Sequence, residues 1–312
     1  MEVDPTKARG YVISENNFQF TEALCKLYHL CIGFNQDPLD EDDFKFTYEY
    51  DDDFTTFPTI CLLAMGCIHM KIFETPGLPA LKPQQLLHGE QIVEVFNPIV
   101  PGSTIKCVAT IEDVADITIL EVFDSFQPSS LQMGPKVKGM LFIVKIDILD
   151  PENPEMQYSR CYMNCYVKGY GGFGDKGVLG LRMPSPPIRT PDQTLEISTN
   201  EKLASLYRIC GDLNPLHMIP SAAKSVGFDK PILHGLCTYG ILSRAVYKTY
   251  CQEDPTLIKS VSARFCSHVF PGETIKIDLY KEANSVFFSA STKERGLVVC
   301  TGVVDLTPLA KI

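Results

Sequence analysis

An aspartate and a histidine, Asp212 and His217, lie five residues apart in this 312-residue chain, with Asn214-Pro215 between them. The Asn-Pro dipeptide disfavours an uninterrupted helix, so the chain is expected to bend here and let the two side chains converge. A carboxylate and an imidazole that meet form a usual acid–base pair for moving protons. We therefore expect Asp212 and His217 to be catalytic, with Asn214 helping to orient a water molecule or the substrate.

A second candidate lies at Gly235, which follows Pro231-Ile232-Leu233-His234 within a predicted buried helix over residues 231–250. Backbone N–H groups at a helix N-terminus lack intrahelical partners and favour a developing oxyanion, so Gly235 is the candidate oxyanion-binding backbone. His234 is expected to pack and hydrogen-bond near the helix start rather than transfer protons. An isolated D-x-N-P-x-H motif would more often form only a turn with a surface histidine.

The first half of the chain is predicted to contain two helices and an antiparallel sheet. Residues 21–32 place apolar side chains on one helical face, and Pro58 begins an apolar helix that runs to about Phe73. Residues 44–50 alternate like a strand, and Gly89 marks a bulge or a close approach in a later strand. Further strands are predicted at residues 86–95, 104–114, 117–126, 139–149 and 157–167.

The second half repeats this order, with predicted helices at residues 201–211, 221–225 and 231–250 and strands at 260–269, 274–280, 285–293 and 297–306. The segment IVPGSTIK (99–106) recurs in the second half as VFPGETIK (269–276). A repeat of this kind indicates two similar structural units. We assign them to residues 1–168 and 193–312, joined by a Gly- and Pro-rich linker at 169–192.

The linker contains G-x-G-x-x-G at Gly169, Gly171 and Gly174, a pattern that also occurs in dinucleotide-binding folds. A dinucleotide fingerprint requires a helix to begin within that turn. Because Gly177, Gly180 and Pro184 follow, no helix is expected to start there. A dehydrogenase is therefore not predicted.

The stretch from Tyr207 to Gly240 resembles the R-specific (type 2) enoyl-CoA hydratases of the MaoC-like double hot-dog family, including the hydratase domain of peroxisomal multifunctional enzymes. The family pattern reads Y-R-x-S-G-D-x-N-P-L-H-x-D-P, then G-F-x-x-P-I-L-H-G-L-C-T-x-G. Cys210 replaces the usual serine and Ile219 the usual aspartate. The resemblance implies an α+β fold, in which each half is a curved antiparallel sheet wrapping a central helix and the two sheets join edge to edge.

The resemblance also implies a function. Its members are hydro-lyases that add water to trans-2-enoyl-CoA to give (3R)-3-hydroxyacyl-CoA in fatty-acid β-oxidation, and no cofactor is implied. Two alternatives remain on this fold: an acyl-CoA thioesterase, in which water attacks the thioester carbonyl, and a non-catalytic acyl-CoA-binding module. The intact D-x-N-P-L-H motif favours the hydratase.

Several residues are candidate substrate contacts. In the family, the residues matching His88, Gly89 and Phe265 touch the CoA ligand, although here His88-Gly89 could be a structural bulge and Phe265 a core residue. Arg264 and Lys259 could meet the CoA phosphates. The remaining candidates flank the catalytic bend or match a family position of open role: Leu213, Pro215, Leu216 and Glu49. Ile117 stands where relatives carry a lysine, so one CoA contact is expected to be missing.

Composition restricts the function classes. A net charge of −10 argues against a general binder of nucleic acid or acidic membranes, so an anionic acyl-CoA would need a local basic patch. No apolar run reaches transmembrane length. Twelve cysteines without a C-x-x-C pair indicate reduced thiols, and six scattered histidines predict no metal site.

The two halves are predicted to be unequal. The offset that aligns IVPGSTIK with VFPGETIK places Asp212 opposite Asp42, which no N-P-x-H follows, and the first-half helix begins FPTICLL without a His-Gly. We therefore expect one active site per chain, with the first half accommodating the acyl chain and part of CoA.

The terminal Ala310-Lys311-Ile312 is similar to variant peroxisomal targeting tripeptides. Exposed sheet edges favour a homodimer.

Overall fold

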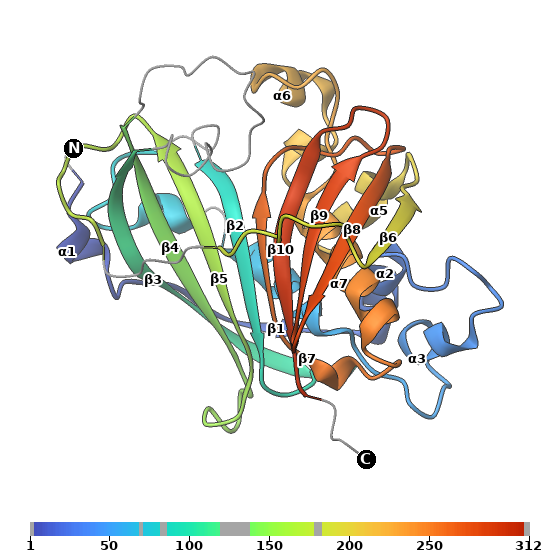
Figure 1. Ribbon diagram of the computed structural model, residues 1–312. Helices are drawn as coiled ribbons and strands as arrows, with labels where there is room; N and C mark the ends of the chain where they lie inside the picture. Colours follow the sequence, from blue (N-terminus) through green and yellow to red (C-terminus); the bar gives the residue numbers. More distant parts are fainter. Residues whose placement is uncertain (1–2, 69–70, 82–85, 119–137, 178–182, 309–312) are drawn as a thin grey trace.

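An antiparallel sheet of ten strands runs through the computed structural model, which describes residues 3–68, 71–81, 86–118, 138–177 and 183–308 (Figure 1). The strand order is β1-β3-β4-β5-β2-β7-β10-β9-β8-β6. The strands are β1 (Val12–Gln19), β2 (Leu86–Val95), β3 (Thr104–Thr118), β4 (Lys138–Leu149), β5 (Gln157–Lys168), β6 (Gln193–Ser198), β7 (Ile258–Phe265), β8 (Thr274–Glu282), β9 (Ser285–Thr292) and β10 (Val298–Leu306).

The two halves of the sheet are related by a pseudo-twofold rotation about the β2–β7 pair. From that pair outward, β2, β5, β4, β3 and β1 correspond in order to β7, β10, β9, β8 and β6. Ile92 pairs with Ser262, its own counterpart at the offset of the IVPGSTIK repeat, so the pseudo-twofold axis passes through this pair. The expected double hot-dog, with its two sheets joined edge to edge, is therefore confirmed.

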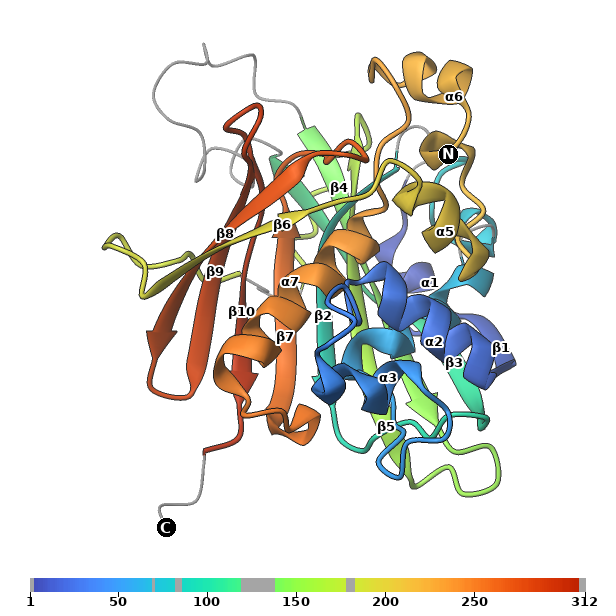
Figure 2. The same ribbon diagram turned by 90° about the vertical axis from the view of Figure 1, so that its right-hand side faces the viewer.

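The helices gather on one side of the sheet, where α2 and α7 lie against its concave face (Figure 2). The α-helices are α1 (Pro5–Ala8), α2 (Glu22–Cys31), α3 (Phe44–Thr47), α5 (Leu203–Ile209), α6 (Pro220–Ser225) and α7 (Gly235–Tyr250). The 3₁₀ helices are η1 (Glu41–Asp43), η2 (Pro58–Cys67), η3 (Lys71–Glu74), η5 (Pro215–His217) and η6 (Pro255–Leu257). Within these ranges, no helix has the length and apolar character needed to cross a membrane.

The central helices of the two halves differ. In the second half, α7 begins at Gly235 rather than at the predicted Pro231, because the chain before it is extended and the Leu233 N–H donates to the Val269 carbonyl. In the first half, the predicted α-helix from Pro58 is instead a 3₁₀ helix that ends at Cys67. Its side chains are apolar on every face and almost all buried, so tertiary packing rather than an amphipathic face holds it.

Other expectations were wrong. Residues 44–47 form helix α3 rather than a strand, and β3 continues unbroken to Thr118 where two strands were predicted; residues 119–126 lie outside the described ranges. The edge strands β1 and β6 were missed. Both carry many polar side chains, as edge strands do, and so lack a strong apolar alternation.

The glycine-rich linker hydrogen-bonds to an aspartate carboxylate of the same chain. The backbone N–H groups of Gly172 and Gly174 donate to the carboxylate of Asp116 at 2.9 and 2.8 Å. A side chain at Gly171 would collide with the backbone of Gly139, so this loop lies directly on β4. In the described part of the linker no helix begins, and the loop amides hold an aspartate where a dinucleotide fold would hold a phosphate.

Candidate active site

A tight bend after α5 positions the first acidic candidate. Gly211 adopts a left-handed φ of +123°, and the Asp212 Oδ1 then accepts the Asn214 N–H at 3.0 Å. Asn214 Oδ1 in turn accepts the Leu216 N–H at 3.0 Å and begins the short helix η5. The Arg208 guanidinium donates to the Asn214 carbonyl at 3.2 Å and ties the bend to α5. The predicted turn therefore exists, and it leads directly into His217.

His217 is buried at the end of η5 and is held by the loop that precedes α7. Its Nδ1 lies 2.9 Å from the carbonyl oxygen of Ile232. A carbonyl only accepts, so Nδ1 carries the proton in this hydrogen bond and Nε2 is the basic nitrogen of the neutral ring. Polar atoms of Asp212, His217 and His234 all lie within 4.8 Å of one another. The predicted convergence of Asp212 and His217 is therefore observed.

His234 is the third member of this cluster and has an unusual environment. It is 1% exposed, its ring stacks on His217 at 3.8 Å between centroids, and Tyr207 lies on it at 4.9 Å. Burial first, and then the charge of His217, lower the pKa of His234 to about 3. The expected packing at the helix start is present, but the expected hydrogen bond there is not: His234 is the N-cap residue of α7 without a side-chain cap.

Three separate segments meet at the start of α7. A side-chain atom added at Gly235 would lie 3.4 Å from the ring of Phe265, at the end of β7. The same ring meets His88, near the start of β2, edge-on at 5.3 Å. The candidate oxyanion backbone and two candidate CoA contacts therefore form one continuous surface across the seam between the two halves.

Gly89 is required for packing. The β2–β5 register shifts between His88 and Glu90, which is the predicted bulge. A side chain at Gly89 would lie 2.2 Å from the ring of Tyr166, so only glycine fits. The bulge and the close approach are both structural, and they place His88 beside Phe265.

The two basic candidates on β7 lie far apart. Lys259 and Arg264 are five residues apart on one strand, so their Cα atoms are about 17 Å from each other. The Arg264 guanidinium pairs at 2.6 Å with Glu90, which is 1% exposed and also accepts from Asn164. Arg264 therefore joins β7 to β2 in this structure, and a single pyrophosphate would not span both basic residues.

The remaining candidates occupy two places. Leu213 and Pro215 are exposed on the catalytic bend, and Leu216 is half-buried there. Glu49 lies in the first half and pairs with Lys26 of α2 at 2.5 Å, which lowers the pKa of its carboxyl. The described contacts of Glu49 join it to α2, whereas the Asp212–His217 cluster is built from the second half.

A small cavity of about 20 Å³ adjoins Asp212 and is walled by both halves. Leu62, Leu63 and Met65 of η2 line one side, and Leu236 of α7 belongs to the other. Sequence reasoning did not identify the η2 residues as site residues. The signal available for them was the Pro58–Cys67 apolar run, which lies where α7 lies in the second half.

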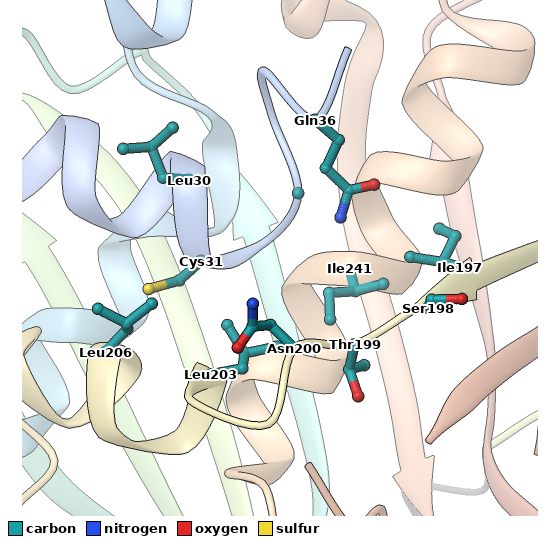
Figure 3. Close-up of a pocket in the computed structure, with 11 residues that line it drawn as sticks. Leu30, Cys31, Gln36, Ile197, Ser198, Thr199, Asn200, Leu203, Leu206 and Ile241 are labelled. Atoms are coloured by element: carbon teal, nitrogen blue, oxygen red, sulfur yellow. The ribbon is translucent and has the colours of Figure 1, made fainter. Parts of the chain in front are cut away.

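A larger cavity of about 420 Å³ lies on another side of α5 and contains none of the predicted site residues. It is lined by the end of α2, the end of β6 and residues of α5 and α7, and Figure 3 shows Gln36 reaching toward Ile241 across it. Leu203 and Leu206 of α5 face this cavity, whereas Tyr207 faces the small one. We place the functional site at the small cavity, because the titratable cluster is there.

The Asp212–His217–His234 cluster has the residue types of a metal site but not its geometry. The two imidazole rings stack at 3.8 Å between centroids, with their planes 28° apart, whereas ligands around a tetrahedral ion point at it from widely different directions. Zinc ligands about 2.1 Å from the ion would lie about 3.4 Å from each other. The ligand atoms of the cluster lie within 4.8 Å of one another, a limit that also accommodates hydrogen-bond partners around one water molecule.

Two family models match the chain. Residues 182–303 match the MaoC like domain, and residues 18–123 match the MFE-2 hydratase 2 N-terminal domain. Each match falls within a different half of the sheet.

Similar proteins cover the whole chain. A probable enoyl-CoA hydratase 2 of Dictyostelium discoideum is 32% identical over 100% of this chain and 99% of its own length. The peroxisomal multifunctional enzyme type 2 of Mus musculus is 31% identical over 98% of this chain, which spans 39% of that larger protein. The crystal structure of a MaoC-like dehydratase from Phytophthora capsici superposes with a TM-score of 0.82 at 29% identity, covering 99% of both chains.

Proposed function

Because the chain belongs to the MaoC-like enoyl-CoA hydratase 2 family, we propose that it adds water to trans-2-enoyl-CoA to form (3R)-3-hydroxyacyl-CoA in fatty-acid β-oxidation. The observation that carries this proposal is the meeting of Asp212 and His217 beside the N-terminus of α7. Hydration requires a polarised carbonyl, a deprotonated water and a proton for Cα. The site offers a group for each requirement.

The proposed reaction is a syn addition. The thioester oxygen accepts hydrogen bonds from backbone N–H groups at Gly235, so electron density leaves Cβ. The water oxygen bonds to Cβ while the Asp212–His217 pair takes a proton from it. The C=C π electrons move toward Cα, and Cα receives a proton from the same pair. Asp212 and His217 titrate as a unit in this scheme, with Asn214 holding the bend.

We assign different roles to the two halves. Residues 193–312 supply the catalytic groups, and residues 1–168 complete the sheet and accommodate the acyl chain and part of CoA. The apolar η2 side chains that wall the cavity beside Asp212 support this division. The proposed substrate-binding surface combines residues at the seam between the halves with the catalytic bend: His88, Gly89, Phe265, Arg264, Leu213, Pro215 and Leu216. Glu49 has no role in the proposed reaction.

The proposed location is the peroxisome. The relative from Mus musculus is named a peroxisomal enzyme, and Ala310-Lys311-Ile312 is similar to targeting tripeptides, although these three residues lie outside the described ranges. A fluorescent fusion is expected to reach peroxisomes and to lose that location when the tripeptide is deleted. Unchanged localisation after deletion would refute the role of the tail.

We also propose a homodimer, since β1 and β6 each pair with one neighbour only and leave an exposed sheet edge. Light scattering coupled to size-exclusion chromatography would measure the mass in solution. A monomer at micromolar concentration would refute this proposal.

The direct test of the activity is to incubate the pure protein with a trans-2-enoyl-CoA and to resolve the enantiomers of the product. The proposal predicts (3R)-3-hydroxyacyl-CoA. Release of free CoA, followed with a thiol reagent, would instead indicate a thioesterase. Binding without turnover would indicate a non-catalytic acyl-CoA-binding module.

A further inference from the structure

Two fully buried histidines, one in each half, differ in how their ring nitrogens are satisfied. His29 donates from Nδ1 to the Phe46 carbonyl at 2.7 Å and accepts the Phe57 N–H on Nε2 at 3.0 Å. His234 has no hydrogen-bond partner on either ring nitrogen within the described residues. The backbone of Asp212 acts on its pKa, but without hydrogen-bond geometry. An unsatisfied buried polar group costs stability, so its retention calls for a ligand that satisfies it.

The position of His234 indicates what that ligand is. Its ring stacks on His217 and meets Tyr207 at a tilt, and a nitrogen lies within 4.8 Å of the polar atoms of Asp212 and His217. Hydrogen-bond partners placed about 2.8 Å from a tetrahedral water oxygen lie about 4.6 Å from one another. Separations within 4.8 Å therefore allow the three groups to share one water.

We propose that His234 is a third catalytic residue, whose ring hydrogen-bonds the water that adds to Cβ of the substrate. This inference rests on the proposed hydratase function and assigns His234 no net proton transfer. The water proton goes to the Asp212–His217 pair and the water oxygen bonds to Cβ, while His234 fixes the direction of attack.

The environment of His234 suits this role. A neutral imidazole offers one donor and one acceptor, so it can orient a water without competing for the proton. Burial and the neighbouring His217 keep the ring neutral, consistent with its lowered pKa. Stacking on His217 and the tilted contact with Tyr207 restrict the ring, so the hydrogen-bonding direction is set before the substrate binds.

The test compares His234→Phe with His29→Phe, since both replace a buried imidazole by an aromatic ring. His234→Phe is expected to lower kcat about a hundredfold, as loss of one preorganised hydrogen bond does, with little change in KM. Its Tm should change little, because the proposed water satisfies the ring nitrogens in the wild type and is lost together with them. His29→Phe should behave differently: Tm falls, because the Phe46 carbonyl and the Phe57 N–H lose their partner, and kcat of the folded protein is retained.

A second variant separates hydrogen bonding from ring stacking. His234→Gln retains a donor and an acceptor and should have a higher kcat than His234→Phe. Equal kcat for the wild type and the Phe variant, or a Phe variant that does not fold, would overturn the proposal. If the proposed hydratase function itself is wrong, the result is distinguishable, because the wild type would then form no 3-hydroxyacyl-CoA.

Discussion

The two halves share a scaffold down to single residues but differ where chemistry is expected. Besides the Pro-Gly turn, E-x-L-x-x-L-Y-x-x-C occurs at Glu22–Cys31 and again at Glu201–Cys210. Tyr28 and Tyr207, a pair within this second repeat, approach to 6.2 Å between ring centroids near the pseudo-twofold axis. The scaffold is therefore duplicated, and the difference between the halves begins just after these helices.

The loop after each helix shows that difference. Gln19 pairs with Thr104 as Ser198 pairs with Thr274, so the elements before the central helix repeat at a larger offset than the later strands. The predicted equivalence of Asp212 with Asp42 is therefore wrong, because it used the smaller offset. At that offset of 179 (198 − 19), Asp212 falls opposite Gly33. A further shift of two residues aligns the Pro-Leu of Asp37-Pro38-Leu39-Asp40 with that of Asn214-Pro215-Leu216-His217, and Asp40 then takes the place of the histidine.

The first-half loop serves to anchor α7. Asp40 pairs with Lys248 of α7 at 3.0 Å, and the fully buried Asp43 pairs with Lys248 at 2.8 Å and with Arg244 at 3.3 Å. The Asn35 N–H also donates to Asp43 at 2.7 Å. The same loop therefore carries an acid–base pair in the second half, whereas in the first half it carries ion pairs that join the two halves.

The largest expected effect comes from removing the acid–base pair. Asp212→Asn or His217→Ala should lower kcat by about a hundredfold or more, since a positioned general acid–base group contributes about that much. Steady-state hydration rates measure this, with circular dichroism to verify folding. Asp40→Ala is the matched control from the first half and should leave kcat unchanged. A folded Asp212 or His217 variant with wild-type turnover would remove the pair from the mechanism.

The two buried histidines predict a loss of stability in mild acid. The pKa of His29 is lowered to about 4 and that of His234 to about 3, in both cases chiefly by burial. Both rings are neutral in the folded protein, so their contribution is fully present above pH 6.5 and is lost as the unfolded state takes up protons below that pH.

Between pH 7 and pH 5 each histidine should cost about 2 kcal/mol of unfolding free energy. Urea titrations at several pH values measure the free energy of unfolding. In the His29→Phe and in the His234→Phe variant, its decrease between pH 7 and pH 5 should be smaller by the contribution of one histidine. A free energy of unfolding that is flat over this range would contradict the burial of both rings.

A smaller effect is expected from the apolar wall. Leu62→Phe adds volume to a cavity that holds about 20 Å³ beside Asp212, so it should lower kcat/KM for long enoyl chains by about tenfold more than for short ones. Ile60→Met, on the same 3₁₀ helix but not lining this cavity, serves as the control. If kcat/KM falls equally for long and short enoyl chains, η2 does not line the site that binds the acyl chain.

Much of this comparison was readable in the sequence. The Asn214-Pro215 bend predicted that Asp212 and His217 converge, and the IVPGSTIK repeat predicted the duplicated sheet. Local patterns were sufficient there because turn chemistry and identical residues report directly on backbone geometry.

Other features depended on tertiary packing. Residues 44–47 alternate like a strand yet form α3, where Phe46 is buried against His29 and Phe57. The polar edge strands β1 and β6 gave no apolar signal, and an all-apolar run such as Pro58–Cys67 does not distinguish a 3₁₀ helix from an α-helix. The unsatisfied ring of His234 was not predictable, since hydrogen-bond satisfaction is a property of the assembled core.

The central claim is that each chain has one active site, in its second half. Calorimetric titration with a tight-binding acyl-CoA analogue tests it most directly, because stoichiometry counts sites without assuming a mechanism. We predict one analogue bound per chain. Two equivalent sites per chain would show that the first half retains a working site and would contradict the account.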